Sequence, residues 1–188
     1  MPKTQDRTPK SERTRAAILD AARATFAELG YDRATVRDIA ARASIDPAMV
    51  IRYFGSKDGL FARATAFDLK LPDLSRVSPG RRGQALVAHF LDVWEGDAGG
   101  GGMTILLRAA ATDPEAADRM REIFASQVAP AMLPGAGRAE VARRAGLVAT
   151  QMLGLAFCRY VLRLPPVVAM TREEIIGSVG PTVQRYLG

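Results

Sequence analysis

Residues 35–61, TVRDIAARASIDPAMVIRYFGSKDGLF, decide the fold of this chain. Apolar residues recur at helical spacing from Val36 to Ala43, which predicts a short helix that Thr35 can cap. Asp46 followed by Pro47 predicts the start of a second short helix, because a side-chain acceptor there precedes a proline at the first helical position. Two short helices joined by a tight turn form the helix-turn-helix pattern, whose second helix lies in the DNA major groove.

A helix on each side completes this unit. The preceding helix, residues 11–29, has one apolar stripe made of Leu19, Ala22, Phe26 and Leu29. Gly30 is expected to end it in a left-handed conformation. The following helix is expected to run from Lys57 to about Leu71 and to link the unit to the rest of the chain.

The stretch resembles the DNA-binding domain of the TetR family of bacterial transcriptional repressors. The likeness covers roughly residues 11–65, and RYFGSKDGLF, residues 52–61, is its most specific part. In this segment an aromatic pair closes the second motif helix and a lysine lies near the start of the next helix. The remainder matches only in length, in helical character and in the terminal PTVQRYL, residues 181–187.

The resemblance and the composition together predict an all-α chain. We expect a disordered basic arm at residues 1–10, a three-helix DNA-binding domain at 11–56, a linking helix at 57–71 and a ligand-binding and dimerisation bundle at 72–188. Within the bundle the apolar spacing predicts helices at residues 84–95, 103–112, 114–133, 138–164 and 171–187. Residues 96–102, with four consecutive glycines at 99–102, are expected to be the most flexible segment.

Composition places the chain among ordinary globular proteins. Of its 188 residues, 48% are apolar and 24% are charged, and the net charge is +6. Residues 1–63 carry 12 basic and 8 acidic side chains, which suits a polyanionic partner and equally suits a solvated surface. The single cysteine, Cys158, favours a reducing compartment. No stretch reaches the ~18 apolar residues of a membrane span, so we expect a cytoplasmic protein without a membrane partner.

Nothing in the sequence indicates an enzyme. His89 is the only histidine, and we expect it to be structural. No Cys/His set has metal-ligand spacing, and the glycine run lacks the Lys-Ser/Thr pair of a phosphate-binding loop. We therefore expect no catalytic residue, no metal and no cofactor; an enzyme built on a helical bundle is the rejected reading.

The second motif helix should supply the DNA-reading side chains, which are Pro47, Ala48, Met49, Ile51, Arg52 and Tyr53. Arg52 alone could make a bidentate contact to guanine, and a phosphate contact or a surface role is its alternative. The resemblance implies phosphate contacts by Thr35, Arg37, Tyr53 and Lys57. The family usually has glycine in the motif turn, where this chain has Ser44, so the turn either tolerates backbone strain or differs in geometry.

The aromatic and methionine residues of the C-terminal part could line an apolar pocket or be plain core; they are Phe90, Trp94, Met103, Met120, Phe124, Met152 and Phe157. From the resemblance we expect a homodimer built by the last two helices, a palindromic operator on double-stranded DNA, and a small hydrophobic ligand that releases it. The alternative is a DNA-binding regulator or architectural protein without a ligand.

Overall fold

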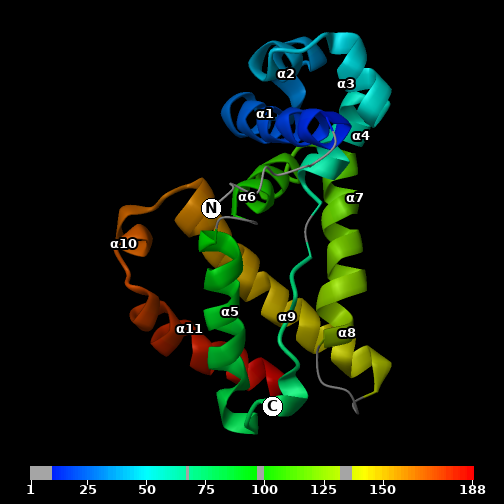
Figure 1. Cartoon of the computed structure of the whole chain (residues 1–188). Helices are drawn as coiled ribbons and strands as arrows, with labels where there is room; N and C mark the ends of the chain where they lie inside the picture. Colours follow the sequence, from blue (N-terminus) through cyan, green and yellow to red (C-terminus); the bar gives the residue numbers. More distant parts are fainter. Residues whose placement is uncertain (1–9, 67, 97–99, 132–136) are drawn as a thin grey trace, which may run out of the picture. The chain divides into compact units, whose positions relative to one another are not determined.

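The structure is a computed structural model that describes residues 10–66, 68–96, 100–131 and 137–188. The chain divides into two compact units, residues 1–66 and 67–188, and the described part of each is built from helices (Figure 1). The predicted all-α fold is therefore confirmed. The predicted arm lies outside the described residues, except for Lys10, which begins the first helix.

The first unit consists of α1 (Lys10–Arg33), α2 (Val36–Ala43), α3 (Pro47–Phe54) and α4 (Lys57–Ala64). Gly30 was expected to end the first helix; it interrupts α1 with a positive φ of 78° and an extended ψ of 170°, and one further turn follows it to Arg33. The core of the unit contains fully buried side chains from all four helices, which include Ile18, Phe26, Ile39, Val50 and Leu60. Leu19 and Leu29 are only half-buried, because the buried face of α1 is turned toward Ile18.

The second unit begins with two 3₁₀ turns, η1 (Leu74–Arg76) and η2 (Pro79–Arg81), followed by α5 (Arg82–Glu95), α6 (Gly100–Ala109) and α7 (Pro114–Ile123). A π-helical turn η3 (Phe124–Val128) leads into α8 (Ala129–Ala131). The chain ends with α9 (Arg138–Ala156), the π-helical turn η4 (Phe157–Val161), α10 (Pro165–Val168) and α11 (Arg172–Leu187).

Helices α5 and α11 pack against each other at two glycines. A Cβ atom added at Gly83 would lie 2.3 Å from the carbonyl oxygen of Gly180. Gln184 strengthens the crossing, since its side-chain oxygen accepts a 3.0 Å hydrogen bond from the Gly83 N–H. The two helix backbones can approach this closely only because neither glycine carries a side chain.

The structure corrects the predicted linking helix at residues 57–71, because α4 ends at Ala64. Arg23 of α1 donates a 3.2 Å hydrogen bond to the carbonyl oxygen of Ala64, and the Thr65 hydroxyl donates to the carbonyl of Phe61. The Arg23 side chain thus satisfies a carbonyl that a longer helix would have used, whereas the Phe61 carbonyl keeps its helical hydrogen bond from the Thr65 N–H at 2.9 Å. The apolar spacing that predicted a helix as far as Leu71 was therefore misleading.

The other predicted helices form with shifted ends. Of the segment expected to be flexible, Gly100–Gly102 form the first turn of α6, and residues 97–99 lie outside the described residues. The long helix predicted at 138–164 is continuous through α9 and the π-helical turn η4 to Val161. The last helix opens with the predicted capping box, in which Thr171 and Glu174 exchange hydrogen bonds of 2.7 and 3.2 Å.

Candidate functional site

Capping side chains fix both helices of the motif. At the start of α2 the Asp38 N–H donates to the Thr35 hydroxyl oxygen at 3.2 Å, and the Thr35 N–H donates to the Asp38 carboxylate at 3.0 Å. The hydrogen bond from the Thr35 hydroxyl holds the pKa of Asp38 below its usual value, and the bond from the Thr35 backbone adds to this effect. At the start of α3 the Ala48 N–H donates to the Asp46 carboxylate at 2.7 Å.

The turn between α2 and α3 tolerates a left-handed serine. Ser44 has φ 55° and ψ 44°, and its N–H points to the carbonyls of Ala40 and Ala41. The motif turn therefore keeps the conformation that suits glycine, and Ser44 bears the steric cost of its Cβ atom. Of the two alternatives left open by the sequence, backbone strain is the one observed.

Helix α3 presents most of its predicted DNA-reading residues to solvent. Val50 points into the core of the unit, with an exposed fraction of 0%, and Tyr53 and Met49 are half-buried. Pro47, Ala48, Ile51 and Arg52 are exposed. Arg52 makes no hydrogen bond or ion pair with the described residues, so its guanidinium is available to a partner.

Lys57 is held in place at the start of α4. Its ammonium nitrogen lies 4.3 Å from the centre of the Tyr31 ring and donates a 3.2 Å hydrogen bond to the carbonyl of Asp32. The Tyr31 hydroxyl in turn donates to the carboxylate of Asp58. A lysine has three donors, so two N–H bonds of Lys57 could still reach an anion at this helix start.

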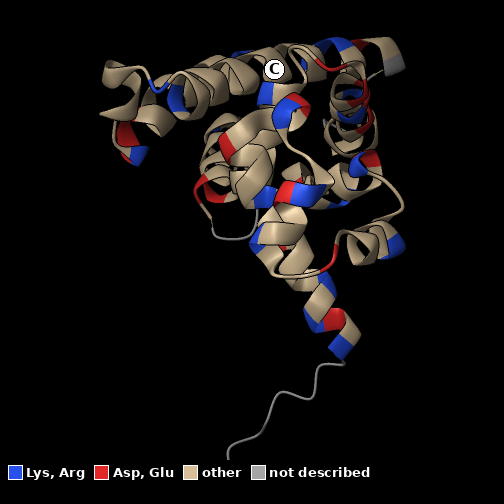
Figure 2. Ribbon diagram, turned by 90° about the horizontal axis from the view of Figure 1, so that it is seen from above, with Lys and Arg blue, Asp and Glu red and all other residues tan. Residues whose placement is uncertain are grey.

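One further cation lies near the motif, on α1. The guanidinium of Arg15 lies 5.5 Å from the centre of the ring of Phe54. Phe54 is the last residue of α3. Figure 2 shows basic positions at the amino-terminal end of α1. The sequence counted Arg15 among the basic residues of the amino-terminal stretch, which could contact DNA phosphate or form a solvated tail. Thr35 and Arg37, the remaining predicted phosphate contacts, are both exposed.

The second unit contains an apolar cavity of about 120 Å³. Six of the seven predicted pocket residues line it, namely Phe90, Trp94, Met103, Met120, Phe124 and Met152. Phe157 does not line it. The sequence analysis missed further lining residues, which look like ordinary core: Leu69, Leu71, Leu86, Val93, Ile123, Val128, Val148, Ala149 and Leu153, as well as His89.

His89 helps to hold one wall of this cavity. Its Nε2 atom donates a 2.7 Å hydrogen bond to the carbonyl of Leu69, and the Leu69 N–H donates to the side-chain oxygen of Gln127 at 2.8 Å. Leu69 lies in the extended segment that follows the first unit. The backbone N–H and the carbonyl of Leu69 both have side-chain partners, which hold this segment in place. The prediction of a structural histidine agrees with this contact.

Two family models match the chain. The model described as the TetR family of bacterial regulatory proteins covers residues 18–64, and the model of the tetracyclin repressor-like C-terminal domain covers residues 81–187. Together they include the motif and most of the second unit. The chain belongs to the TetR family.

Relatives of this TetR-family chain are known in sequence and in structure. An HTH-type transcriptional repressor of Mycobacterium tuberculosis is 49% identical over 49 residues, which is 26% of each chain. The match therefore spans only about a quarter of that curated relative. A TetR-family regulator from Streptomyces coelicolor is 29% identical, with a TM-score of 0.61 over 96% of this chain and 98% of the other. NalD of Pseudomonas aeruginosa shares the fold, at 20% identity and a TM-score of 0.69 over 94% and 97% of the two chains.

Within the described ranges, no group of three or more His, Cys, Asp and Glu residues is placed to hold a metal ion. Across the same residues, none of the helices has the length and apolar character needed to cross a bilayer.

Proposed function

We propose that this TetR-family protein is a cytoplasmic homodimeric repressor that binds a palindromic operator and leaves it when a small hydrophobic ligand binds. The observation that carries the DNA-binding part is the exposed face of α3, where Arg52 is available beside Ile51, Ala48 and Pro47. Helix-turn-helix proteins direct this part of the second helix at base edges. The M. tuberculosis relative is named as a repressor, which supports repression rather than activation for this protein.

Replacement of the two cations tests this assignment. Arg52→Ala should weaken operator binding at least fivefold and relax the sequence preference, because a bidentate contact to guanine contributes ~1–3 kcal/mol of discrimination. Lys57→Ala should weaken binding to all sequences alike and lower the slope of log affinity against log salt by about 1. A gel-shift titration on an operator selected from random DNA would measure both.

Arg76→Ala is the matched control, since Arg76 is 87% exposed in the second unit. It should bind like the wild type. If Arg52→Ala and Lys57→Ala also bind like the wild type, these residues do not contact DNA.

The apolar cavity of the second unit supports the proposal that a small ligand binds. It is smaller than the ~300–1,000 Å³ of most drug-sized pockets, so a compact apolar or aromatic molecule fits it best. Because α4 ends at Ala64, the response would pass through the segment around Leu69 and Leu71, which lines the cavity, rather than along one continuous helix. A regulator without a ligand remains the second candidate.

Three helical glycines with empty space beside their Cα atoms support the proposed homodimer. A Cβ atom added at Gly146 or Gly154 of α9, or at Gly177 of α11, would meet nothing within 4 Å. Glycine inside a helix costs about 1 kcal/mol relative to alanine, which a close approach by a helix of a second copy could offset. A dimer would also place two α3 helices on half-sites about 34 Å apart.

A further inference from the structure

The wall of the cavity in the second unit carries no charge. Among the described lining residues there is no Asp, Glu, Lys or Arg. The lining side chains are aliphatic, aromatic or methionine, and within the same described set only His89 and Trp94 contain a nitrogen. A charged molecule would lose its hydration in this cavity without gaining an ion-pair partner, so the cavity selects a neutral ligand.

The size of the cavity sets the size of the ligand. Its volume is about 120 Å³. An apolar protein cavity of about 150 Å³ holds one benzene molecule. A small aromatic molecule with few substituents therefore fills this cavity, and its ring can contact the aromatic and methionine side chains of the wall.

One hydrogen bond fixes the position of the proton on the His89 ring. The Nε2 atom lies 2.7 Å from the carbonyl oxygen of Leu69, which can only accept. Nε2 therefore carries the proton, and in the neutral imidazole Nδ1 is left as an acceptor. Nδ1 makes no hydrogen bond within the part of the chain that the structure describes. In that same part the fully buried side-chain atoms without a partner are limited to Nε of Arg119, so Nδ1 keeps accessible surface.

Nδ1 of His89 has no strong competitor for a hydrogen-bond donor among the described lining side chains. The indole N–H of Trp94 can only donate, and the methionine sulfurs are weak acceptors. A ligand that displaces water from Nδ1 without replacing its hydrogen bond leaves a polar atom unpaired, which lowers affinity. A ligand with one donor avoids this loss.

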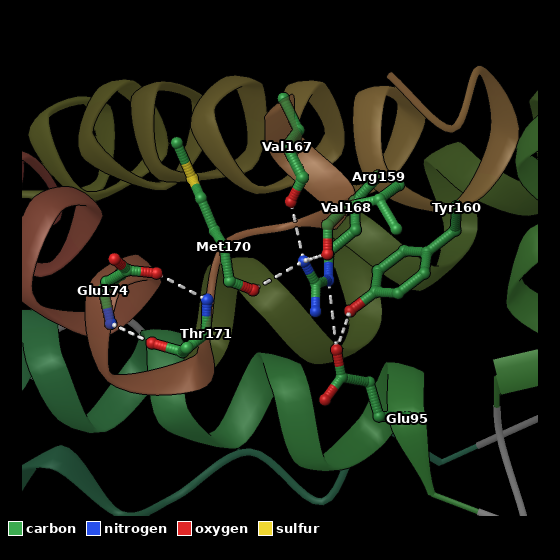
Figure 3. Close-up of polar contacts among 8 residues, drawn as sticks. All are labelled: Glu95, Arg159, Tyr160, Val167, Val168, Met170, Thr171 and Glu174. Carbon is green, nitrogen blue, oxygen red and sulfur yellow. Dashed lines mark hydrogen bonds and ion pairs between the residues drawn. The ribbon is translucent and has the colours of Figure 1, made fainter. Parts of the chain in front are cut away.

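The helix that carries His89 is fixed near its carboxyl end. Trp94, on the same helix α5, stacks on the Tyr160 ring with 5.1 Å between the ring centres and 8° between the ring planes. The Tyr160 hydroxyl donates to the Glu95 carboxylate at 3.0 Å, and Nε of Arg159 donates to the same oxygen at 3.1 Å (Figure 3). Burial, with the hydrogen bond to Glu95, raises the pKa of Tyr160, so the hydroxyl stays a donor. This wall is formed before a ligand binds, and little ordering opposes binding.

We propose that the ligand of this cavity is a small neutral aromatic molecule with one hydrogen-bond donor, such as a phenolic hydroxyl, and that Nδ1 of His89 accepts that bond. This inference rests on the proposed ligand site, to which it adds the chemical class of the ligand and the atom that selects it. Because Nε2 of the same ring holds Leu69, one imidazole contacts both the ligand and the segment that follows the first unit.

The single histidine allows a direct test by nuclear magnetic resonance. In the untagged full chain labelled with ¹⁵N-histidine, the only imidazole signals are those of His89. At pH 8 we expect Nε2 to be protonated and Nδ1 to be unprotonated. Phenol should move the Nδ1 resonance toward that of a protonated nitrogen, as acceptance of a hydrogen bond does. Toluene has nearly the same shape but no donor, and it should leave this resonance in place.

Two substitutions separate the roles of the two nitrogens. His89→Gln can place its amide nitrogen where Nε2 lies and keep the bond to Leu69, but it lacks the Nδ1 acceptor. His89→Asn is the matched variant, because its side-chain oxygen can take the place of Nδ1 while the side chain is too short to reach Leu69. Calorimetric titration should show the ratio of phenol affinity to toluene affinity at least fivefold lower in His89→Gln than in the wild type. In His89→Asn the ratio should stay within about twofold of the wild type.

The outcomes separate the inference from the proposed function. If neither phenol nor toluene binds, the ligand site and the inference fall together. Binding of both compounds without a shift of the Nδ1 resonance, or with the same affinity ratio in His89→Gln, would overturn the inference alone. Benzoate, a carboxylate on the same ring, should not bind, and tight binding of it would also overturn the inference. The resonance measurement uses the wild type, so it decides the question even if a variant does not fold.

Discussion

Ser44 carries a backbone strain that glycine would relieve. A left-handed conformation costs a residue with a Cβ atom ~1–2 kcal/mol, and part of the gain from glycine is offset by ~0.5–1 kcal/mol of backbone entropy. Ser44→Gly should therefore raise the free energy of unfolding by about 0.5–1 kcal/mol, which urea denaturation can measure.

Ser56→Gly is the control for this change, since Ser56 has φ −146° and caps α4 through a 3.0 Å hydrogen bond from the Gly59 N–H. It should lower stability by a few tenths of a kcal/mol. A loss of stability in Ser44→Gly as well would mean that the Ser44 side chain has a stabilising contact.

Glu140 links stability to pH. Hydrogen bonds from Arg143 and then Arg144 lower its pKa from 4.5 to about 2. Because the folded pKa lies below the unfolded one, the stabilisation is complete above pH 4.5 and is lost as the pH falls toward 2. Glu140→Gln should thus be less stable than the wild type at pH 7, with the difference shrinking below pH 4.5 in thermal melts.

The exposed Glu173 provides the comparison, because it has no ion pair in the part of the chain that the structure describes. Glu173→Gln should melt like the wild type across this range. A stability deficit of Glu140→Gln that stays constant with pH would contradict the assigned cause.

At the scale of the elements, the crossing of α5 and α11 depends on missing side chains. Gly83→Ala would place a Cβ atom against the backbone of α11, so the helices must separate. Overpacking of this kind typically costs ~1–3 kcal/mol, and we expect a loss of stability near the upper end.

Gly101→Ala in α6 is the matched substitution, since its added Cβ atom would meet nothing within 4 Å. It should stabilise the chain by up to about 1 kcal/mol. Thermal melts of both variants decide the point, and a Gly83→Ala protein as stable as the wild type would show that the crossing is loose.

The caps of the elements could be predicted from sequence, whereas one helix end could not. Thr35, Asp46 and Thr171 bond to backbone groups two or three residues away, so local sequence specifies them. The end of α4 depends on Arg23, which lies 41 residues earlier and takes the carbonyl of Ala64. No local pattern contains that contact, and the apolar spacing beyond Ala64 pointed to a longer helix.

At the scale of the whole molecule, the proposed ligand should stabilise the chain. A compact aromatic compound such as indole, if it fills the cavity, should raise the melting temperature and lower operator affinity. Binding at a hundred times its dissociation constant contributes ~2.7 kcal/mol. Ala149→Phe, which fills the cavity from α9, should reduce both responses, and Ala142→Phe, at an exposed position of α9, should keep them.

A screen of small apolar compounds that leaves the melting temperature unchanged would favour the regulator without a ligand. Stabilisation without any effect on operator affinity would contradict the proposed coupling between the two units.

The sequence by itself determined the all-α class, the helix-turn-helix and the positions of its caps, because these depend on apolar spacing and on hydrogen bonds between near neighbours. It also nominated six cavity residues, since large apolar side chains gather wherever a helical bundle encloses space. Only the tertiary structure decided that Ser44 is left-handed, that α4 ends at Ala64 and that Leu69 is held by His89 and Gln127. The end of α4 and the position of Leu69 depend on partners that are distant in sequence. Serine itself does not favour the left-handed conformation, so the sequence left it open; in the structure Ser44 adopts it at the end of α2, where the Ser44 and Ile45 N–H groups donate to the carbonyls of Ala41 and Ala40.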